Sequence, residues 1–333
     1  MKLSEIGEFG LIARFSPAFL KNAQAGEIGI GDDCAVLPWT RSERLLVTTD
    51  MLVEDSHFLR GAISARDLGE KSLAVNLSDI AAMGGTPLWA FLSLGIPSGI
   101  EVEWLDEFFA GLARLARASG VRLMGGDTTK SPDRLVINIA VLGTVRADRV
   151  KFRSGAKPGD LIAVTGNLGD SGAGLRVVLE NRPRGRDENF LVRAHHRPRA
   201  HLAEGAWLAA RPGVTAMMDV SDGIDSDLRR IMERSGCGAA VDLDRLPISK
   251  PLRRCALKYG WDAAEAAASG GEDYCLVATI DPARFQRIEA GFKRRFGRPL
   301  FSIGEIVPPT RGLSYLRSSI PAALGRRGFD HFK

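Results

Sequence analysis

The 333-residue chain has few cysteines, and no two of them stand close together in the sequence. Cys34, Cys237, Cys255 and Cys275 form no CxxC pair, which argues against a zinc ribbon or a disulfide framework and favours reduced thiols. No stretch approaches the ~20 apolar residues of a membrane-spanning helix, and the first residues lack the apolar segment of a signal peptide. We therefore expect a cytoplasmic protein that has no membrane partner.

Several common catalytic signatures are also missing. The chain has no GxxxxGK[ST] loop, no protein-kinase HRD or DFG motif and no GxSxG nucleophile elbow. The glycine-rich turn GNLGDSG at residues 166–172 follows an expected strand, but its spacing is not GxGxxG, so packing of a helix against the sheet explains it better than phosphate binding. None of the five histidines is paired at metal-ligand spacing, and we expect His195 and His196, in an arginine-rich stretch, on the solvated surface.

Charge of one sign is not in large excess. The 45 basic residues against 40 acidic ones give a net charge of +5 and an isoelectric point near 9.2. No dense basic block interleaved with aromatic residues is present, so we expect no nucleic-acid partner. A non-catalytic basic protein that binds nucleic acid stays as an alternative, and it predicts strongly salt-dependent binding without ATP turnover.

The length predicts two domains of mixed α/β structure. A polar segment at residues 147–160, with Gly155 and Pro158-Gly159, divides the expected domains into residues 1–147 and 148–333. Apolar patterning predicts strands at 45–49, 121–124, 135–145, 161–165, 214–218, 239–243 and 275–280. It predicts helices at 67–83 and 101–119, from about 171, and from 224 to Gly236.

Aspartates recur in tight turns beside Gly, Ser or Thr, often directly after an expected strand. They are Asp32, Asp33, Asp50, Asp127, Asp219 and Asp222, and Asp79 stands apart from them within an apolar helix. Loops at the carboxyl ends of strands are where open sheets place ligands. If these carboxylates converge, cations must offset their repulsion, and oxygen ligands without His or Cys favour Mg²⁺ and nucleotide phosphates.

A series of motifs along nearly the whole chain closely resembles the thiamine-monophosphate kinase family. The motifs are GIGDDCAVL, TTDMLVEDSHF, KSLAVNLSDIAAMGGTP, GGDTT, SGAKPGD, TGNLGDSGAGL, MDVSDGIDSDL, SGGEDY and GFDHF. The wider superfamily, with aminoimidazole ribonucleotide synthetase and selenophosphate synthetase, shares the aspartate-rich pattern. A sister ATP-dependent synthetase acting on another substrate is therefore the alternative, but it should lack GGEDY and the GFDHF tail.

The resemblance implies a two-domain aminoimidazole ribonucleotide synthetase-like α/β fold, with an N-terminal sheet that pairs across a homodimer and a C-terminal α/β domain. It implies transfer of the γ-phosphoryl group of ATP to thiamine monophosphate, with several Mg²⁺ ions per site and ATP as co-substrate. The implied magnesium ligands are Asp33, Thr48, Thr49, Asp50, Asp79, Asp127, Asp219 and Asp222, of which Asp50, Asp79, Asp127 and Asp222 are the implied catalytic residues. The implied nucleotide contacts are Asp33, Gly126, Asp127, Arg153 and Ser221, and the implied thiamine contacts are His57, Glu272 and Phe329.

Three features depart from the common family pattern and bear on fine specificity. Cys275 stands where Glu is frequent, the segment before His57 is Glu54-Asp55-Ser56, and the tail aromatic is Phe329 where Tyr also occurs. The chemistry fits the family reaction, because a phosphate monoester with a second pKa near ~6 is already largely dianionic at neutral pH and needs no general base. It needs relief from repulsion between two polyanions and in-line positioning, so we expect His57 to position the substrate.

Overall fold

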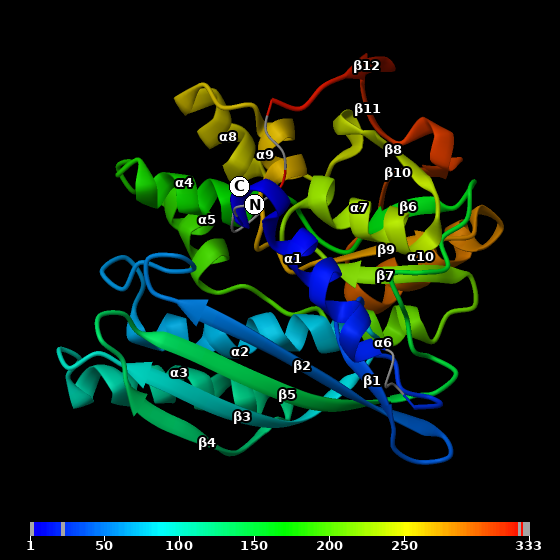
Figure 1. Cartoon of the computed structure of the whole chain (residues 1–333). Helices are drawn as coiled ribbons and strands as arrows, with labels where there is room; N and C mark the ends of the chain where they lie inside the picture. The colour runs from blue at the N-terminus through cyan, green and yellow to red at the C-terminus, as the bar shows by residue number, and fades with distance from the viewer. Residues whose placement is uncertain (1–2, 21–23, 326–327, 329–333) are drawn as a thin grey trace.

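Two β-sheets, each with its own helices, make up the fold in the computed structural model, which describes residues 3–20, 24–325 and 328 (Figure 1). The first sheet is five-stranded, in the order β1-β2-β5-β3-β4, and only β3 and β4 run parallel. Its strands are β1 (Ala35–Pro38), β2 (Glu43–Val53), β3 (Thr86–Ile96), β4 (Arg122–Lys130) and β5 (Val136–Arg146). The accompanying helices are α1 (Leu3–Leu20), α2 (Ala65–Ala82) and α3 (Val102–Ser119).

The second sheet is seven-stranded, in the order β12-β11-β8-β10-β6-β9-β7. Its strands are β6 (Leu161–Val164), β7 (Val214–Asp219), β8 (Gly238–Asp242), β9 (Leu276–Ile280), β10 (Phe301–Val307), β11 (Leu313–Arg317) and β12 (Ile320–Ala322). The helices are α4 (Asp170–Leu179), α5 (Arg186–His196), α6 (Leu202–Ala209), α7 (Ile224–Ser235), α8 (Lys250–Tyr259), α9 (Ala263–Ser269) and α10 (Pro282–Phe296). Two short 3₁₀ turns, η1 (Leu243–Arg245) and η2 (Pro309–Arg311), complete the half.

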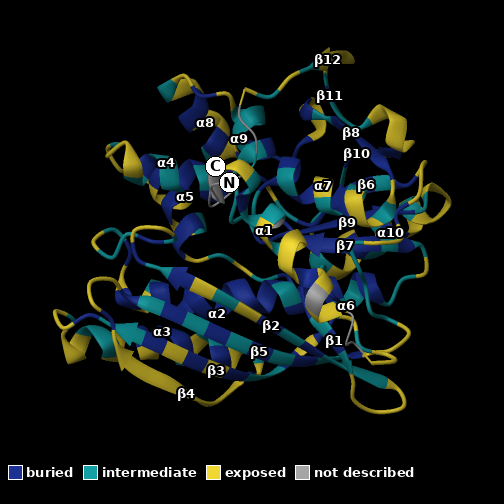
Figure 2. Cartoon of the chain, in the orientation of Figure 1, coloured by how far each residue is buried: buried dark blue, intermediate teal, exposed yellow. Residues whose placement is uncertain are grey.

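Helix α2 lies between the two halves and is buried along most of its length (Figure 2). One side contacts β2, β3, β5 and α3, and the other contacts α5, α6 and β7. Glycines allow α2 and α3 to approach closely: a Cβ at Gly69 would lie 2.0 Å from the Phe108 carbonyl oxygen, and one at Gly111 would lie 1.9 Å from that of Arg66. This helix also carries buried polar side chains, among them Glu70, Lys71 and Asn76, which must find partners inside the protein.

The structure confirms the expected mixed α/β class and most of the predicted elements. The predicted apolar strand at 135–145 is the central strand β5, and the helices predicted at 67–83 and 101–119 are α2 and α3. The predicted strand at 121–124 is longer, since pairing with β3 carries β4 through Gly125 and Gly126 to Lys130. Helix α1 was not predicted from the sequence.

One face of the five-stranded sheet carries no described helix, because α2 and α3 pack on the other face (Figure 1). Alternate residues of β5, from Ile137 to Val145, are buried toward α2, whereas their neighbours are only half-buried. Met51 and Phe91 belong to the uncovered face and are 54% and 42% exposed. No helix within the described ranges is long and apolar enough to cross a bilayer.

Candidate active site

A cleft of about 1120 Å³ is lined by residues of both halves of the protein. The N-terminal half contributes β2, the loop after it and two turns of α2, and the C-terminal half contributes Arg153, α4, α5 and the loops at Asp219–Asp222 and Gly271–Tyr274. Most of the candidate site residues identified from the sequence line this cleft. They are Asp33, Thr48, Thr49, Asp50, His57, Asp79, Arg153, Asp219, Ser221, Asp222 and Glu272.

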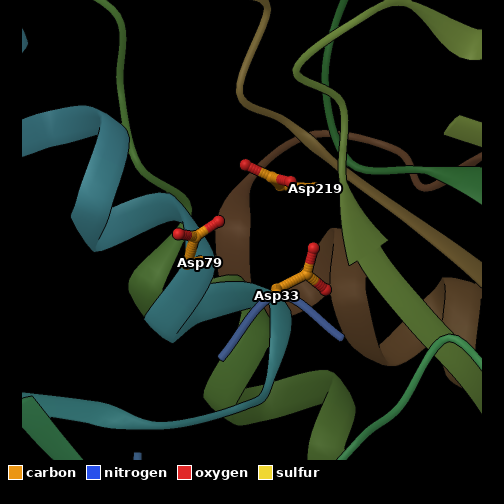
Figure 3. A group of neighbouring side chains, drawn as sticks. All are labelled: Asp33, Asp79 and Asp219. Atoms are coloured by element: carbon orange, nitrogen blue, oxygen red, sulfur yellow. The ribbon is translucent and has the colours of Figure 1, made fainter. Parts of the chain in front are cut away.

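Three aspartates from distant parts of the chain meet at one end of the cleft. Asp33 precedes β1, Asp79 lies in the last turn of α2, and Asp219 ends β7. One carboxylate oxygen from each lies within 4.8 Å of the others, and Figure 3 shows the three side chains turned toward a common space. Such a group can hold a cation with oxygen ligands alone.

Neighbouring side chains fix two of these carboxylates. Thr48 donates its hydroxyl proton to Asp79 Oδ2, and Ser78 donates to Asp219 Oδ2 over 2.6 Å. Strand β2 and helix α2 thus set the geometry of the cluster, because both hydroxyls stand on these two elements.

An arginine holds the third carboxylate. Arg153 Nη2 donates to Asp33 Oδ1 over 2.7 Å, while the other oxygen, Asp33 Oδ2, is buried and has no hydrogen-bond partner among the described residues. A buried carboxylate oxygen without a donor fits a site for a metal ion, since burying a charge without a partner is costly.

Burial and mutual repulsion disturb the titration of the cluster. Burial first, and then the charge of Asp33, raises the pKa of Asp50 to about 6 and that of Asp219 to about 8. The pKa of Asp79 lies well above its usual range because of burial and the carboxylates of Asp50, Asp219 and Asp33. These shifts mean that the ionised carboxylates repel one another, and a bound divalent cation would reverse that penalty.

The residues implied as thiamine contacts enter the same cleft from two sides. His57 lies in the loop after β2, where its Nδ1 accepts a hydrogen bond of 3.0 Å from the Val53 amide. Glu272 lies opposite, in the loop between α9 and β9, and has a left-handed backbone with φ of 61°. Its amide donates to the Ser221 carbonyl oxygen over 2.6 Å, which joins this loop to the one that carries Asp222.

Gly126 and Asp127 do not reach the cleft within one chain. Both lie on β4, an exposed edge strand, in a separate groove of about 500 Å³ beside Phe109 of α3. Phe329 lies outside the described residues. The described tail residue nearest to it, Gly328, packs closely on the start of α7 and the loop before it: a Cβ there would lie 2.6 Å from the Cβ of Ser226 and 2.8 Å from the Asp222 carbonyl oxygen.

Two segments that depart from the family pattern have structural roles. Glu54 is buried, accepts a hydrogen bond of 2.9 Å from the Leu135 amide and pairs with Arg60 over 2.8 Å, so it anchors the loop that carries His57. Asp55 has a left-handed backbone and pairs with Arg134 over 2.6 Å. Cys275 is a buried filler at the start of β9, and burial raises the pKa of its thiol well above the usual range.

The prediction that His195 and His196 lie on the solvated surface was wrong. They are 5% and 8% exposed, because the inner side of α5 packs against α4, and both line the cleft. His195 Nδ1 lies 3.0 Å from Glu272 Oε2. The sequence analysis also missed Lys71 of α2, whose side chain is fully buried. Other charged residues, such as Asp67 and Glu70, stand beside it in the helix, so the local sequence does not mark this lysine as buried.

The glycine-rich turn before α4 packs against helix α9, whereas packing against the sheet was expected. The Asp273 carboxylate accepts hydrogen bonds of 2.6 and 3.2 Å from the amides of Gly169 and Ser171. A Cβ at Gly169 would lie 2.7 Å from the backbone of Ala266 and Ala267 in α9. The start of α4 is therefore satisfied by a carboxylate of the protein itself.

Comparison with known proteins gives matches over nearly the whole chain. Residues 31–145 match the N-terminal domain of AIR synthase related proteins, and residues 157–314 match the C-terminal domain. The thiamine-monophosphate kinase of Salmonella typhimurium is 40% identical over 98% of both chains, and that of Bacillus subtilis is 33% identical over 98% of this chain and 99% of its own.

Comparison with solved structures points to the same family. AaThiL complexed with AMPPCP and TMP superimposes with a TM-score of 0.85 at 32% identity, covering 99% of both chains. Thiamine monophosphate kinase from Aquifex aeolicus gives 0.81 at 31% identity, covering 97% of this chain and 99% of its own. The hydrogenase maturation protein HypE of E. coli, at 22% identity, shares the fold with a TM-score of 0.72. The chain matches both domain models and is 40% identical to a thiamine-monophosphate kinase over 98% of both chains. It therefore belongs to the thiamine-monophosphate kinase family.

Proposed function

We propose that the protein transfers the γ-phosphoryl group of ATP to thiamine monophosphate, in a magnesium-dependent reaction that makes thiamine diphosphate. The observation that carries this proposal is the cleft that brings the cluster of Asp33, Asp79 and Asp219 together with His57 and Glu272. A related protein of known structure was obtained with the ATP analogue AMPPCP and TMP. A phosphate donor and a phosphate acceptor require a site that tolerates two polyanions, and a cation-binding carboxylate cluster supplies one.

The acidic end of the cleft would hold the cations. Asp33, Asp79 and Asp219 supply the converging oxygens, with Asp50 beside them and Asp222 on the next loop. Bound Mg²⁺ would neutralise charge on the phosphates. Arg153 is held at this end by Asp33, so its guanidinium also stands where it can donate to nucleotide oxygens.

No residue needs to remove a proton from the acceptor, which is already largely dianionic at neutral pH. His57 fits a positioning role. Its Nδ1 accepts from the Val53 amide, so the neutral ring carries its proton on Nε2 and can donate from there to the substrate. Direct transfer in one displacement follows, because the chain has no recognisable phospho-acceptor motif.

A homodimer formed through the five-stranded sheet belongs to the same proposal. The uncovered face carries Val47 and Met51 of β2, Phe91 of β3 and Leu142 of β5, which form an apolar surface of the kind that a second copy buries. The exposed edge strand β4, with Asp127, borders this face. A partner sheet laid on it would account for a nucleotide contact from β4 that one chain does not bring to its own cleft.

The test is an assay for thiamine diphosphate formation from ATP and thiamine monophosphate, with and without Mg²⁺. We expect product only with the metal, and none when an aminoimidazole ribonucleotide precursor replaces thiamine monophosphate. Turnover of the precursor in place of thiamine monophosphate would favour a sister synthetase. Salt-dependent binding to DNA or RNA without any ATP turnover would favour the nucleic-acid alternative.

A further inference from the structure

The junction between the two halves contains an ion pair whose buried lysine, Lys71, has no role in the proposed reaction. Lys71 of α2 has no exposed side-chain surface, and its Nζ lies 3.0 Å from both carboxylate oxygens of Glu272. Lysine is almost never fully buried unless it is paired, because an isolated ammonium loses its hydration. Lys71 therefore requires the Glu272 carboxylate in its ionised form.

His195 of α5 completes the arrangement. Its Nδ1 lies 3.0 Å from Glu272 Oε2 and 3.1 Å from the hydroxyl of Ser171. Burial first, and then the charge of Lys71, lowers the pKa of His195, so the ring is neutral at pH 7. An ionised Glu272 only accepts hydrogen bonds, which assigns the ring proton to Nδ1.

Glu272 itself stays accessible from the cleft, with 24% of its side chain exposed. Burial alone would favour its neutral acid, but Lys71 and then His195 lower its pKa to about 2. Its backbone is equally constrained, since both Glu272 and Tyr274 have left-handed φ angles, 61° and 49°. Non-glycine residues in this conformation persist where the surroundings hold them, and they gather at functional sites.

The helix that carries Lys71 also carries the metal side of the cleft. Asp79 is eight residues further along α2, which places it about 12 Å along the helix axis at 1.5 Å per residue. One rigid element thus sets the distance between the cation cluster and the Glu272 carboxylate, although Glu272 belongs to the other half of the protein.

We propose that Lys71, with His195, is a positioning residue that fixes the Glu272 carboxylate for recognition of the thiamine moiety. This inference rests on the proposed function. An ionised, immobile carboxylate suits the two features of that moiety, an exocyclic amine that donates hydrogen bonds and a thiazolium cation. Lys71 does not touch the substrate in this arrangement, since its ammonium is covered and directed at Glu272.

The test compares Lys71→Met, Glu272→Gln and the double variant in steady-state kinetics. Lys71→Met should raise the KM for thiamine monophosphate about tenfold, which corresponds to ~1.4 kcal/mol, and should leave the KM for ATP nearly unchanged. The double variant should be no worse than Glu272→Gln alone, because Lys71 acts only through that carboxylate. Arg298→Met is the control: it removes a partner of the buried Glu204, 2.6 Å away, and does not line the cleft.

The kinetic results distinguish failure of the proposed function from failure of the role of Lys71. If the wild-type protein makes no thiamine diphosphate, the proposed function falls, and the inference falls with it. If the wild type is active but Lys71→Met keeps its KM for thiamine monophosphate, or the effects of the two substitutions multiply in the double variant, only the role of Lys71 is refuted. If Lys71→Met does not fold, the KM for thiamine monophosphate of the charge-balanced double variant is compared with that of Glu272→Gln. A higher KM in the double variant refutes the role of Lys71, and an equal KM supports it.

Discussion

The carboxylate cluster makes a prediction about stability that is independent of turnover. Asp219 is 2% exposed, and burial followed by the charge of Asp33 raises its pKa from an ordinary 3.8 to about 8. The folded state therefore holds this proton more tightly than the unfolded chain, and the wild type loses stability as pH rises from about 4 to about 8. In Asp219→Asn this loss disappears, while the amide oxygen can still accept from Ser78.

The size of the expected change in the free energy of unfolding follows from the shift in the pKa of Asp219. Each pKa unit is worth 1.36 kcal/mol, so a shift of about four units sets an upper limit of about 5 kcal/mol at pH 8. Local relaxation and entry of water reduce the cost of a buried charge, and we expect a gain of ~2 kcal/mol in metal-free protein. That corresponds to a rise in Tm of about 2–5 °C at pH 8 and to no rise at pH 4.

The assay is thermal unfolding of the full chain in EDTA and in Mg²⁺, at pH 4 and pH 8. Asp225→Asn is the matched control, because Asp225 is also buried but is paired with Arg229 and accepts from Tyr315 over 2.6 Å. These partners lower the pKa of Asp225 against the effect of burial, so its charge stabilises the fold above pH 4, and that stability is lost as the pH falls. Asp225→Asn should therefore lower the Tm at pH 8.

The same cluster predicts how the Tm responds to Mg²⁺. The wild type should gain Tm on addition of Mg²⁺ at pH 8, since a ligand that binds only the folded state stabilises it. Asp219→Asn should lose most of this gain and its activity. A lower Tm for Asp219→Asn than for wild type in EDTA at pH 8, or an unchanged response to Mg²⁺, would refute the view of the cluster as mutually repelling cation ligands.

Four further outcomes follow from the same structure. Asp50→Asn and Asp79→Asn should each abolish thiamine diphosphate formation while circular dichroism shows an intact fold; near wild-type turnover in both would contradict the cluster. ATP with a chiral γ-phosphoryl group should give inversion at phosphorus, whereas retention would require a covalent intermediate. Light scattering should give a dimer mass at micromolar concentration, and Phe91→Glu, on the uncovered sheet face, should shift it toward a monomer. Phe329→Ala should raise the KM for thiamine monophosphate several-fold and leave the KM for ATP unchanged, because an aromatic face attracts the thiazolium cation by ~0.5–2 kcal/mol; equal loss for both substrates would favour a packing role.

Much of the candidate site could be predicted from local sequence. Asp219 ends the apolar strand β7 just before a turn, and such turns present side chains at a sheet edge. Asp50 was expected directly after a strand at 45–49, but it lies inside β2, which continues to Val53 because it pairs with β5 over its whole length. Asp79 was visible as an acidic residue inside an apolar helix. The types of these residues, oxygen donors without a histidine or cysteine among them, already favoured a hard cation.

Other features depended on contacts that local patterns do not encode. The arginine-rich surroundings of His195 suggested a solvated helix, yet α4 and the loop of Glu272 cover that side of α5. Asp127 follows the same turn pattern as Asp219, but β4 is an edge strand whose position lies outside the cleft of its own chain. Strand order places the two residues differently, and strand order arises from pairing between distant segments.

By itself, the sequence determined the mixed α/β class, the family and the kind of ligand chemistry, because these are set by residue type, by the period of apolar side chains and by motifs only a few residues long. Only the tertiary structure decided which carboxylates converge and which side chains cross between the two halves. Lys71 and Glu272 stand 201 positions apart, and nothing in either segment identifies the other as its partner. Their pairing is imposed by burial, since an ammonium enclosed between two packed halves is stable only beside a carboxylate.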